Sequence, residues 1–92
     1  MHDPYRIIKT VNINGGGDVI ETSGGDVEFL GVNMVDDMAM LSYTHSPDAP
    51  GRKSFKAFTI PNNGVLPENT FYVDNFWYDG MNYFVFLQEE AK

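Results

Sequence analysis

The sequence predicts an all-β fold, a small antiparallel β-sandwich or barrel of about six strands with a C-terminal aromatic hairpin. Clusters of glycine and proline divide the chain into short apolar segments of strand length. Polarity tends to alternate within these segments with a period of two, and none carries the apolar stripe of an amphipathic helix. The last two segments are joined by Asp79-Gly80, a residue pair that favours the tight turn of a β-hairpin.

Each predicted strand ends where glycine or proline interrupts the alternation. The predicted strands are 5–13, 27–35, 38–45, 52–60, 70–78 and 81–88, and 19–22 is a shorter extended piece. The runs 14–18 and 23–26 are predicted turns, because glycine adopts positive φ without steric penalty. The runs 46–51 and 61–69 contain proline, which lacks the N–H that a strand needs, and are predicted loops. Residues 1–92 are expected to form a single β domain.

Residues 27–45 are predicted to form a hairpin that closes at Asp36-Asp37. A two-residue turn pairs Val35 with Met38, Met34 with Ala39, Val32 with Leu41, Leu30 with Tyr43 and Glu28 with His45. Directly opposed residues share a face of the sheet, so this register gives a face that is apolar until its last pair. Asp-Asp is a weaker turn signal than Asp-Gly, so a bulge or a longer loop is the alternative.

The C-terminal hairpin carries most of the aromatic side chains of the chain. A two-residue turn places Tyr78, Phe76, Asp74 and Tyr72 opposite Met81, Tyr83, Val85 and Leu87, and places Trp77, Asn75, Val73 and Phe71 opposite Asn82, Phe84, Phe86 and Gln88. Both faces are largely apolar, and a domain of this size has little chain left to cover the second one. We therefore expect one face to contact a partner, by default a second copy of the chain, through Phe76, Trp77, Tyr78 and Tyr83. The alternative places the hairpin at the centre of a barrel with a loop over its back.

Composition and charge narrow the classes of function. Thirteen acidic residues against six basic ones give a net charge of −7, which argues against direct binding to nucleic acid or to an anionic membrane. No apolar run approaches the roughly 20 residues of a membrane span, and the first residues do not resemble a signal peptide. The chain contains no cysteine. These features predict a cytoplasmic protein.

The sequence contains no motif that predicts catalytic residues, a metal site or a cofactor. The two histidines, His2 and His45, lack the spacing of a metal site. The glycine-rich turns are not followed by the Gly-Lys-Ser/Thr of a phosphate-binding loop. We therefore expect a protein that is not an enzyme and acts by binding.

Five of the six cationic side chains fall in two predicted strands, 5–13 and 52–60. Arg52 and Lys56 share a strand face, and with Tyr43 or Trp77 stacking on a base they would bind a small anionic, nucleotide-like ligand. The alternative is an edge strand whose lysines block aggregation.

The order of the segments resembles that of a group of short, uncharacterised proteins encoded by bacteriophages. The shared layout has a first strand, a turn, a segment like Gly-Asp-Val-Glu-Phe-Leu-Gly-Val at 25–32, an aspartate- and proline-containing loop, a strand like 52–58 and a final aromatic hairpin. This resemblance implies a phage accessory protein in the host cytoplasm, and it implies no activity and no functional residue.

Together these inferences predict a binding protein, a homo-oligomer that acts as a host-defence inhibitor. In one mechanism it sequesters a small anionic ligand between subunits. In another, its acidic surface masks a host protein that normally binds nucleic acid. The alternative function is a structural virion or tail accessory protein.

Overall fold

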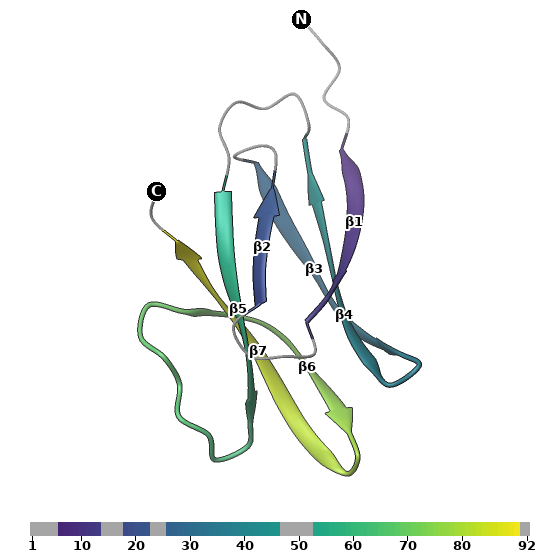
Figure 1. The fold of residues 1–92 in the computed structure, drawn as a ribbon, viewed down its shortest axis with the longest axis vertical. Coiled ribbons are helices and arrows are strands. Elements are labelled where there is room, and N and C mark those ends of the chain that lie inside the picture. Colours follow the sequence, from purple (N-terminus) through teal and green to yellow (C-terminus); the bar gives the residue numbers. More distant parts are fainter. Residues whose placement is uncertain (1–5, 14–17, 23–25, 47–52, 91–92) are drawn as a thin grey trace, which may run out of the picture.

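The computed structural model describes residues 6–13, 18–22, 26–46 and 53–90, and every regular element within these ranges is a β-strand (Figure 1). The strands are β1 (Ile7–Asn12), β2 (Asp18–Thr22), β3 (Val27–Val35), β4 (Met38–His45), β5 (Lys53–Pro61), β6 (Phe71–Tyr78) and β7 (Met81–Glu90). The all-β prediction is confirmed. The seventh strand is β2, where the sequence predicted only a short extended piece. Across the described ranges, no helix has the length and apolarity needed to cross a membrane.

The strands form two antiparallel sheets. One sheet has the order β1-β4-β3 and the other the order β2-β5-β7-β6. Their inner faces pack on each other through alternate residues of each strand, as in a sandwich. At the centre, Phe29 of one sheet meets Phe55 of the other edge to face, with ring centroids 5.1 Å apart. The buried core consists of Ile13, Ile20, Val32, Ala39, Leu41, Tyr43, Phe55, Ala57, Val85 and Leu87.

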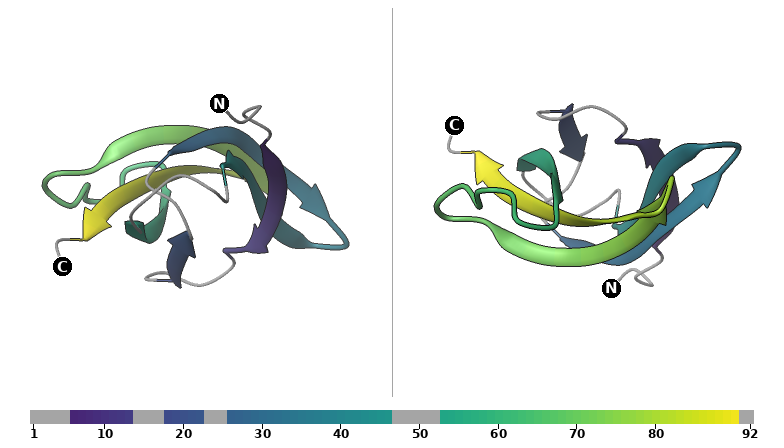
Figure 2. Two further views of the ribbon diagram at one scale, coloured as in Figure 1. Left: turned by 90° about the horizontal axis from the view of Figure 1, so that it is seen from above. Right: turned by 90° about the horizontal axis from the view of Figure 1, so that it is seen from below.

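Hydrogen bonds join the two sheets along both sides. On one side β6 runs beside β3 (Figure 2), and the Asp74 carboxylate accepts a hydrogen bond of 2.7 Å from the Val32 backbone N–H. On the other side, the Ile13 N–H donates to the Ala39 carbonyl at 2.9 Å, and the Ile13 carbonyl accepts from the Thr59 hydroxyl at 3.3 Å. The sandwich is therefore partly closed, towards a barrel.

The β3–β4 register follows the prediction near the turn and departs from it further along. Val35 pairs with Met38, Met34 with Ala39 and Val32 with Leu41, as predicted. A bulge at Leu30 then shifts the register, so Tyr43 pairs with Phe29 and His45 with Val27. The predicted pairs Leu30–Tyr43 and Glu28–His45 are wrong.

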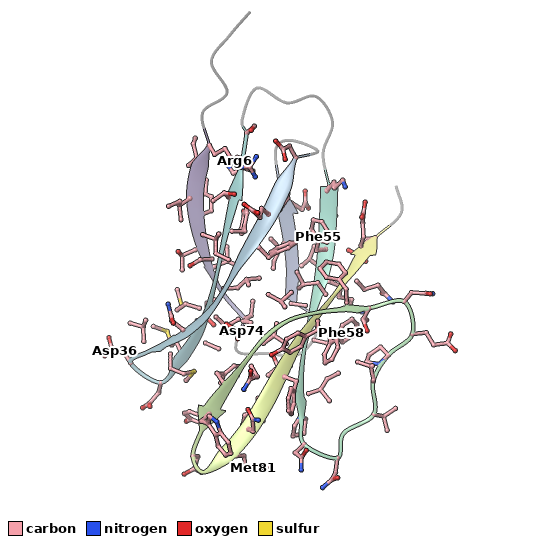
Figure 3. The ribbon with its side chains drawn as sticks, turned by 180° about the vertical axis from the view of Figure 1, so that it is seen from behind. Arg6, Asp36, Phe55, Phe58, Asp74 and Met81 are labelled. Atoms are coloured by element: carbon pink, nitrogen blue, oxygen red, sulfur yellow. The ribbon has the colours of Figure 1, made fainter. Side chains whose placement is uncertain are left out.

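This bulge lies directly beside the contact of β3 with β6. Gly31 adopts φ +147°, and a Cβ atom there would lie 2.8 Å from Asp74 Oδ2. The absence of a side chain at Gly31 lets the carboxylate reach the Val32 N–H. Figure 3 shows Asp74 on β6 where this strand lies beside β3.

The β6–β7 hairpin shows the same behaviour. The predicted pairs from Tyr78–Met81 to Asp74–Val85 are confirmed, including Phe76–Tyr83 and Trp77–Asn82. A bulge between Tyr72 and Asp74 then shifts the register, so Tyr72 pairs with Phe86 and Phe71 with Leu87. The predicted pairs Tyr72–Leu87, Val73–Phe86 and Phe71–Gln88 are therefore wrong. Both bulges flank the Asp74–Val32 contact, which bends the two strands toward each other.

Candidate functional site

The tips of the two hairpins lie at the same end of the molecule, remote from Arg6 (Figure 3). The β3–β4 turn has Asp36 at φ 50° and Asp37 at φ 64°, and the β6–β7 turn has Asp79 at φ 51° and Gly80 at φ 78°. Positive φ at both central residues is the signature of the type I′ turn, whose twist matches that of the flanking strands. The predicted two-residue turns are therefore confirmed, and three aspartates sit at this end of the fold.

Between the two hairpins lies a hollow of about 310 Å³, which we call the tip groove. Its lining comes from both hairpins and from β5: Met34, Asp37, Ala39, Thr59, Phe76, Tyr78 and Tyr83. The rings of Phe76 and Tyr83 stack, with centroids 5.5 Å apart and planes 19° apart. This stack follows from the register, because directly paired residues of two strands project from the same face. The groove therefore has an aromatic floor.

Carboxylates from both hairpins stand at the rim of the tip groove. Asp37 lines the groove itself. A second hollow of about 470 Å³ shares Met34, Asp37 and Tyr78 with it and adds Trp77 and Asp79. None of the described residues that line either hollow is a lysine or an arginine. Aromatic ring faces and carboxylates both attract cations, so the arrangement suits a positively charged group.

Three of the four residues predicted for an interface come together in the tip groove. Phe76 and Tyr83 are half-buried in its floor, and Tyr78 is 42% exposed at its side. Trp77 projects from the opposite face of the hairpin and is 65% exposed. It reaches the second hollow beside Asp79. Their role as an interface stays a prediction.

The outer face of the β6–β7 hairpin is partly covered by a loop. A loop over the back of the hairpin was part of the alternative to a partner contact. The connection between β5 and β6 crosses β7 (Figure 3), and the Gln88 side chain donates a 2.9 Å hydrogen bond to the Glu68 carbonyl in this connection. The cover is incomplete, since Tyr72 is 51% exposed and Trp77 more so. The hairpin therefore has a buried part, a loop-covered part and an open end.

The three residues predicted to bind an anion are not brought together by the described part of the chain. Tyr43 is buried on the inner face of β4, where its ring lies 5.9 Å from that of Phe29, and this burial raises the pKa of its hydroxyl. Lys56 alternates with Phe55 on β5 and lies on the outer face, with its ammonium 5.6 Å from the Phe58 ring centroid. Arg52 lies outside the described residues. The anion-binding role stays a prediction.

Two other described cations, Arg6 and Lys53, form ion pairs within the fold. Arg6 forms an ion pair of 2.6 Å with Asp26 and also donates to Thr44. Lys53 lies 3.8 Å from a carboxylate oxygen of Glu89. Strand β5 lies between β2 and β7, so its lysines do not guard a sheet edge, and the edge-strand alternative is wrong for β5. Lys9 does lie on an edge strand, β1.

The sequence reasoning missed the acidic half of the site, Asp37 and Asp79. A signal for it was present, because both predicted two-residue turns contain aspartate and one of them adjoins the aromatic residues. Within the described ranges there is no group of three or more His, Cys, Asp or Glu that could hold a metal ion. The chain matches no protein-family model, and comparisons with curated proteins and with solved structures find no match either.

Proposed function

We propose that this chain is a non-enzymatic binding protein that docks a basic segment of a partner protein in the tip groove and thereby masks it. The observation that carries the proposal is the composition of the groove, an aromatic floor from Phe76 and Tyr83 with Asp37 at its rim. An arginine or lysine side chain fits both parts, since its stem packs on the rings and its charged end pairs with a carboxylate.

Charge complementarity favours a basic partner over a second copy of the chain. Each copy carries a net charge of −7, and the rim of the groove contributes Asp37 and Asp79 to that charge. Two such ends facing each other would bring like charges together. A basic segment meets no such repulsion at the groove, and at low salt the acidic rim would attract it over a longer distance.

The nature of the partner follows from the same charge argument. Proteins that bind nucleic acid present basic surfaces to phosphates, and an acidic groove competes for those surfaces. The resemblance to phage accessory proteins supports a host protein as the partner and inhibition of host defence as the outcome. Sequestration of a small anion has less support, because Tyr43 is buried and lies on the opposite side of the four-stranded sheet from Lys56.

The test is the binding of a fluorescein-labelled peptide of alternating arginine and glycine, followed by anisotropy. The double variant Asp37→Asn/Asp79→Asn keeps residues that tolerate positive φ and removes two charges from the rim. The matched control, Glu21→Gln/Glu28→Gln, removes two charges from exposed side chains of β2 and β3. Both variants change the net charge from −7 to −5.

We expect the groove variant to weaken peptide binding about tenfold or more, as loss of charge-assisted contacts does, and the control to weaken it about twofold. Equal losses in the two variants would contradict the proposal, because they would mean that the peptide responds only to net charge. A mass measurement in solution checks the competing occupant. A stable dimer that the groove variant strengthens would assign the groove to a second copy.

A further inference from the structure

The outer face of the β6–β7 hairpin holds a third hollow of different chemistry, which we call the asparagine hollow. It has a volume of about 430 Å³ and lies between the hairpin tip and the start of the β5–β6 connection. Its lining is Asn62, Asn63, Trp77, Gly80, Met81 and Asn82. None of these six residues carries a charged side chain. The volume falls within the roughly 300–1,000 Å³ range of small-molecule sites.

The hollow combines an exposed aromatic platform with side-chain amides. Trp77 is 65% exposed and Met81 is 46% exposed. Each asparagine amide offers both a donor and an acceptor, so neighbouring amides can bind hydroxyl groups in pairs. The face of an indole ring is electron-rich and attracts polarised C–H groups that stack on it.

A hydrogen-bonded chain fixes one of the amides. The Tyr72 hydroxyl donates to Asn75 Oδ1 at 2.8 Å, and Asn75 Nδ2 donates to Asn82 Oδ1 at 3.0 Å. The acceptor oxygen of Asn82 is therefore held toward Asn75, which fixes the orientation of this amide beside the hollow. The loop end of the hollow is also anchored, because the Asn62 N–H donates to the Asn82 carbonyl at 3.2 Å. The Asn82 amide and the backbone at Asn62 are therefore positioned before a ligand arrives.

We infer that the asparagine hollow binds a neutral sugar ring, which stacks its C–H face on Trp77 and pairs its hydroxyls with Asn62, Asn63 and Asn82. Three amides around one platform match a ligand that carries hydroxyls around its ring. A nucleobase needs only one amide in the plane of its edge, so three amides exceed its need. A nucleotide also carries a phosphate, which a chain of net charge −7 would repel. A neutral polyhydroxylated ring therefore fits the hollow best. This inference does not depend on the proposed function.

The site has a built-in reporter, because Trp77 is the only tryptophan of the chain. We would screen the intact chain on an array of neutral glycans and titrate the strongest binder while following tryptophan emission. Adenosine and sorbitol are titrated in parallel. Adenosine is a base with a sugar attached and tests whether a base stacks on Trp77, and sorbitol is a polyol without a ring and tests whether hydroxyl groups alone are enough. We expect a saturable change in emission with the glycan and none with sorbitol.

Two pairs of variants locate the binding. Asn63 and Asn69 lie in the same connection with φ 71° and φ 60°, and only Asn63 lines the hollow. Asn63→Gly is therefore compared with Asn69→Gly, and Asn62→Ala is compared with Asn33→Ala on β3. We expect the hollow variants to raise the glycan Kd about fivefold or more, and the controls to leave it within about twofold.

Four results would overturn the inference. These are no glycan binding on the array, equal effects of hollow and control variants, a response to sorbitol equal to the response to the glycan, and a response to adenosine that exceeds it. The peptide assay above is run on the same Asn63→Gly variant. Unchanged peptide binding there keeps the two proposals separate, so that either can fail alone.

Discussion

The two hairpins of this molecule are built alike and differ in what they carry. β3–β4 and β6–β7 each close with a two-residue type I′ turn, and each contains one bulge. The second turn position is Gly80 in β6–β7 and Asp37 in β3–β4. Glycine adopts positive φ without strain, whereas a residue with a Cβ atom does so at a cost of about 1–2 kcal/mol. The β3–β4 hairpin therefore keeps an acidic residue where glycine would be more stable.

The tip groove needs residues from both hairpins. β6–β7 supplies the stacked rings of Phe76 and Tyr83, and β3–β4 supplies Met34 and the strained Asp37. Strained residues often persist at functional sites, where the surrounding structure holds them in place. Their relative position is fixed by the contact of Asp74 with Val32. Substitutions at Asp74, at Asp37 and at Tyr43 test how the two hairpins differ.

The largest effect is expected for Asp74→Ala, which separates the hairpins. The Val32 N–H loses its 2.7 Å acceptor, and an unsatisfied N–H near the core lowers the free energy of unfolding by about 1–3 kcal/mol. Urea denaturation measures this loss, and the arginine peptide should also bind more weakly because the two sides of the groove are no longer held together.

The control for this change is Asp74→Asn, which keeps a carbonyl oxygen as an acceptor and should lose less stability. A second check uses Gly31→Ala, whose Cβ atom would lie 2.8 Å from Asp74 Oδ2. This substitution should be less harmful in the Asp74→Ala background than alone. An unchanged urea midpoint in Asp74→Ala would show that the contact does not hold the sheets together.

An intermediate effect is expected for Asp37→Gly, which makes the β3–β4 turn resemble the β6–β7 turn. Relief of the positive φ should raise the free energy of unfolding by about 1 kcal/mol, while peptide binding weakens because a rim carboxylate is lost. Asp36→Gly is the matched variant in the same turn, and it should leave peptide binding closer to the parent value. A variant that gains stability and binds as tightly as the parent would remove Asp37 from the site.

The smallest effect concerns the core end of the β3–β4 hairpin. Burial raises the pKa of Tyr43 above the ordinary value of 10.0. The unfolded chain therefore loses this proton first as pH rises, and stability present below pH 10.0 declines above it. Tyr43→Phe should reduce this alkaline decline, seen as a smaller shift of the urea midpoint between neutral and alkaline pH. The same decline in both proteins would mean that Tyr43 ionises equally well in the folded state.

Local signals predicted the parts of the fold that local physics decides. Both turns and the register beside them followed from residue type and strand alternation, as the pairs Val35–Met38 and Tyr78–Met81 show. The bulges were not predicted, and each lies beside the contact of Val32 with Asp74, two residues 42 positions apart that no local signal relates. β2 became a full strand because it pairs with β5, another contact between distant residues.

The candidate site was half predicted for the same reason. The aromatic side of the tip groove lies in one hairpin, so its residues could be picked from the sequence. The acidic side needs the β3–β4 tip to lie beside the β6–β7 tip, which only the packing of the two sheets decides. Tyr43 lies on the same face of β4 as Ala39 and Leu41, as the sequence predicted, but only the packing of the second sheet shows that this face is buried and closed to a ligand.

The most direct test of the account is to map the arginine peptide on the isotope-labelled chain by amide chemical shifts. We expect the perturbed residues to cluster at the two hairpin tips, at Met34 to Ala39 and Phe76 to Tyr83, and the Asp37→Asn/Asp79→Asn variant to lose these shifts. Shifts spread evenly over exposed acidic residues, or centred on β2 and the β5–β6 connection, would contradict it.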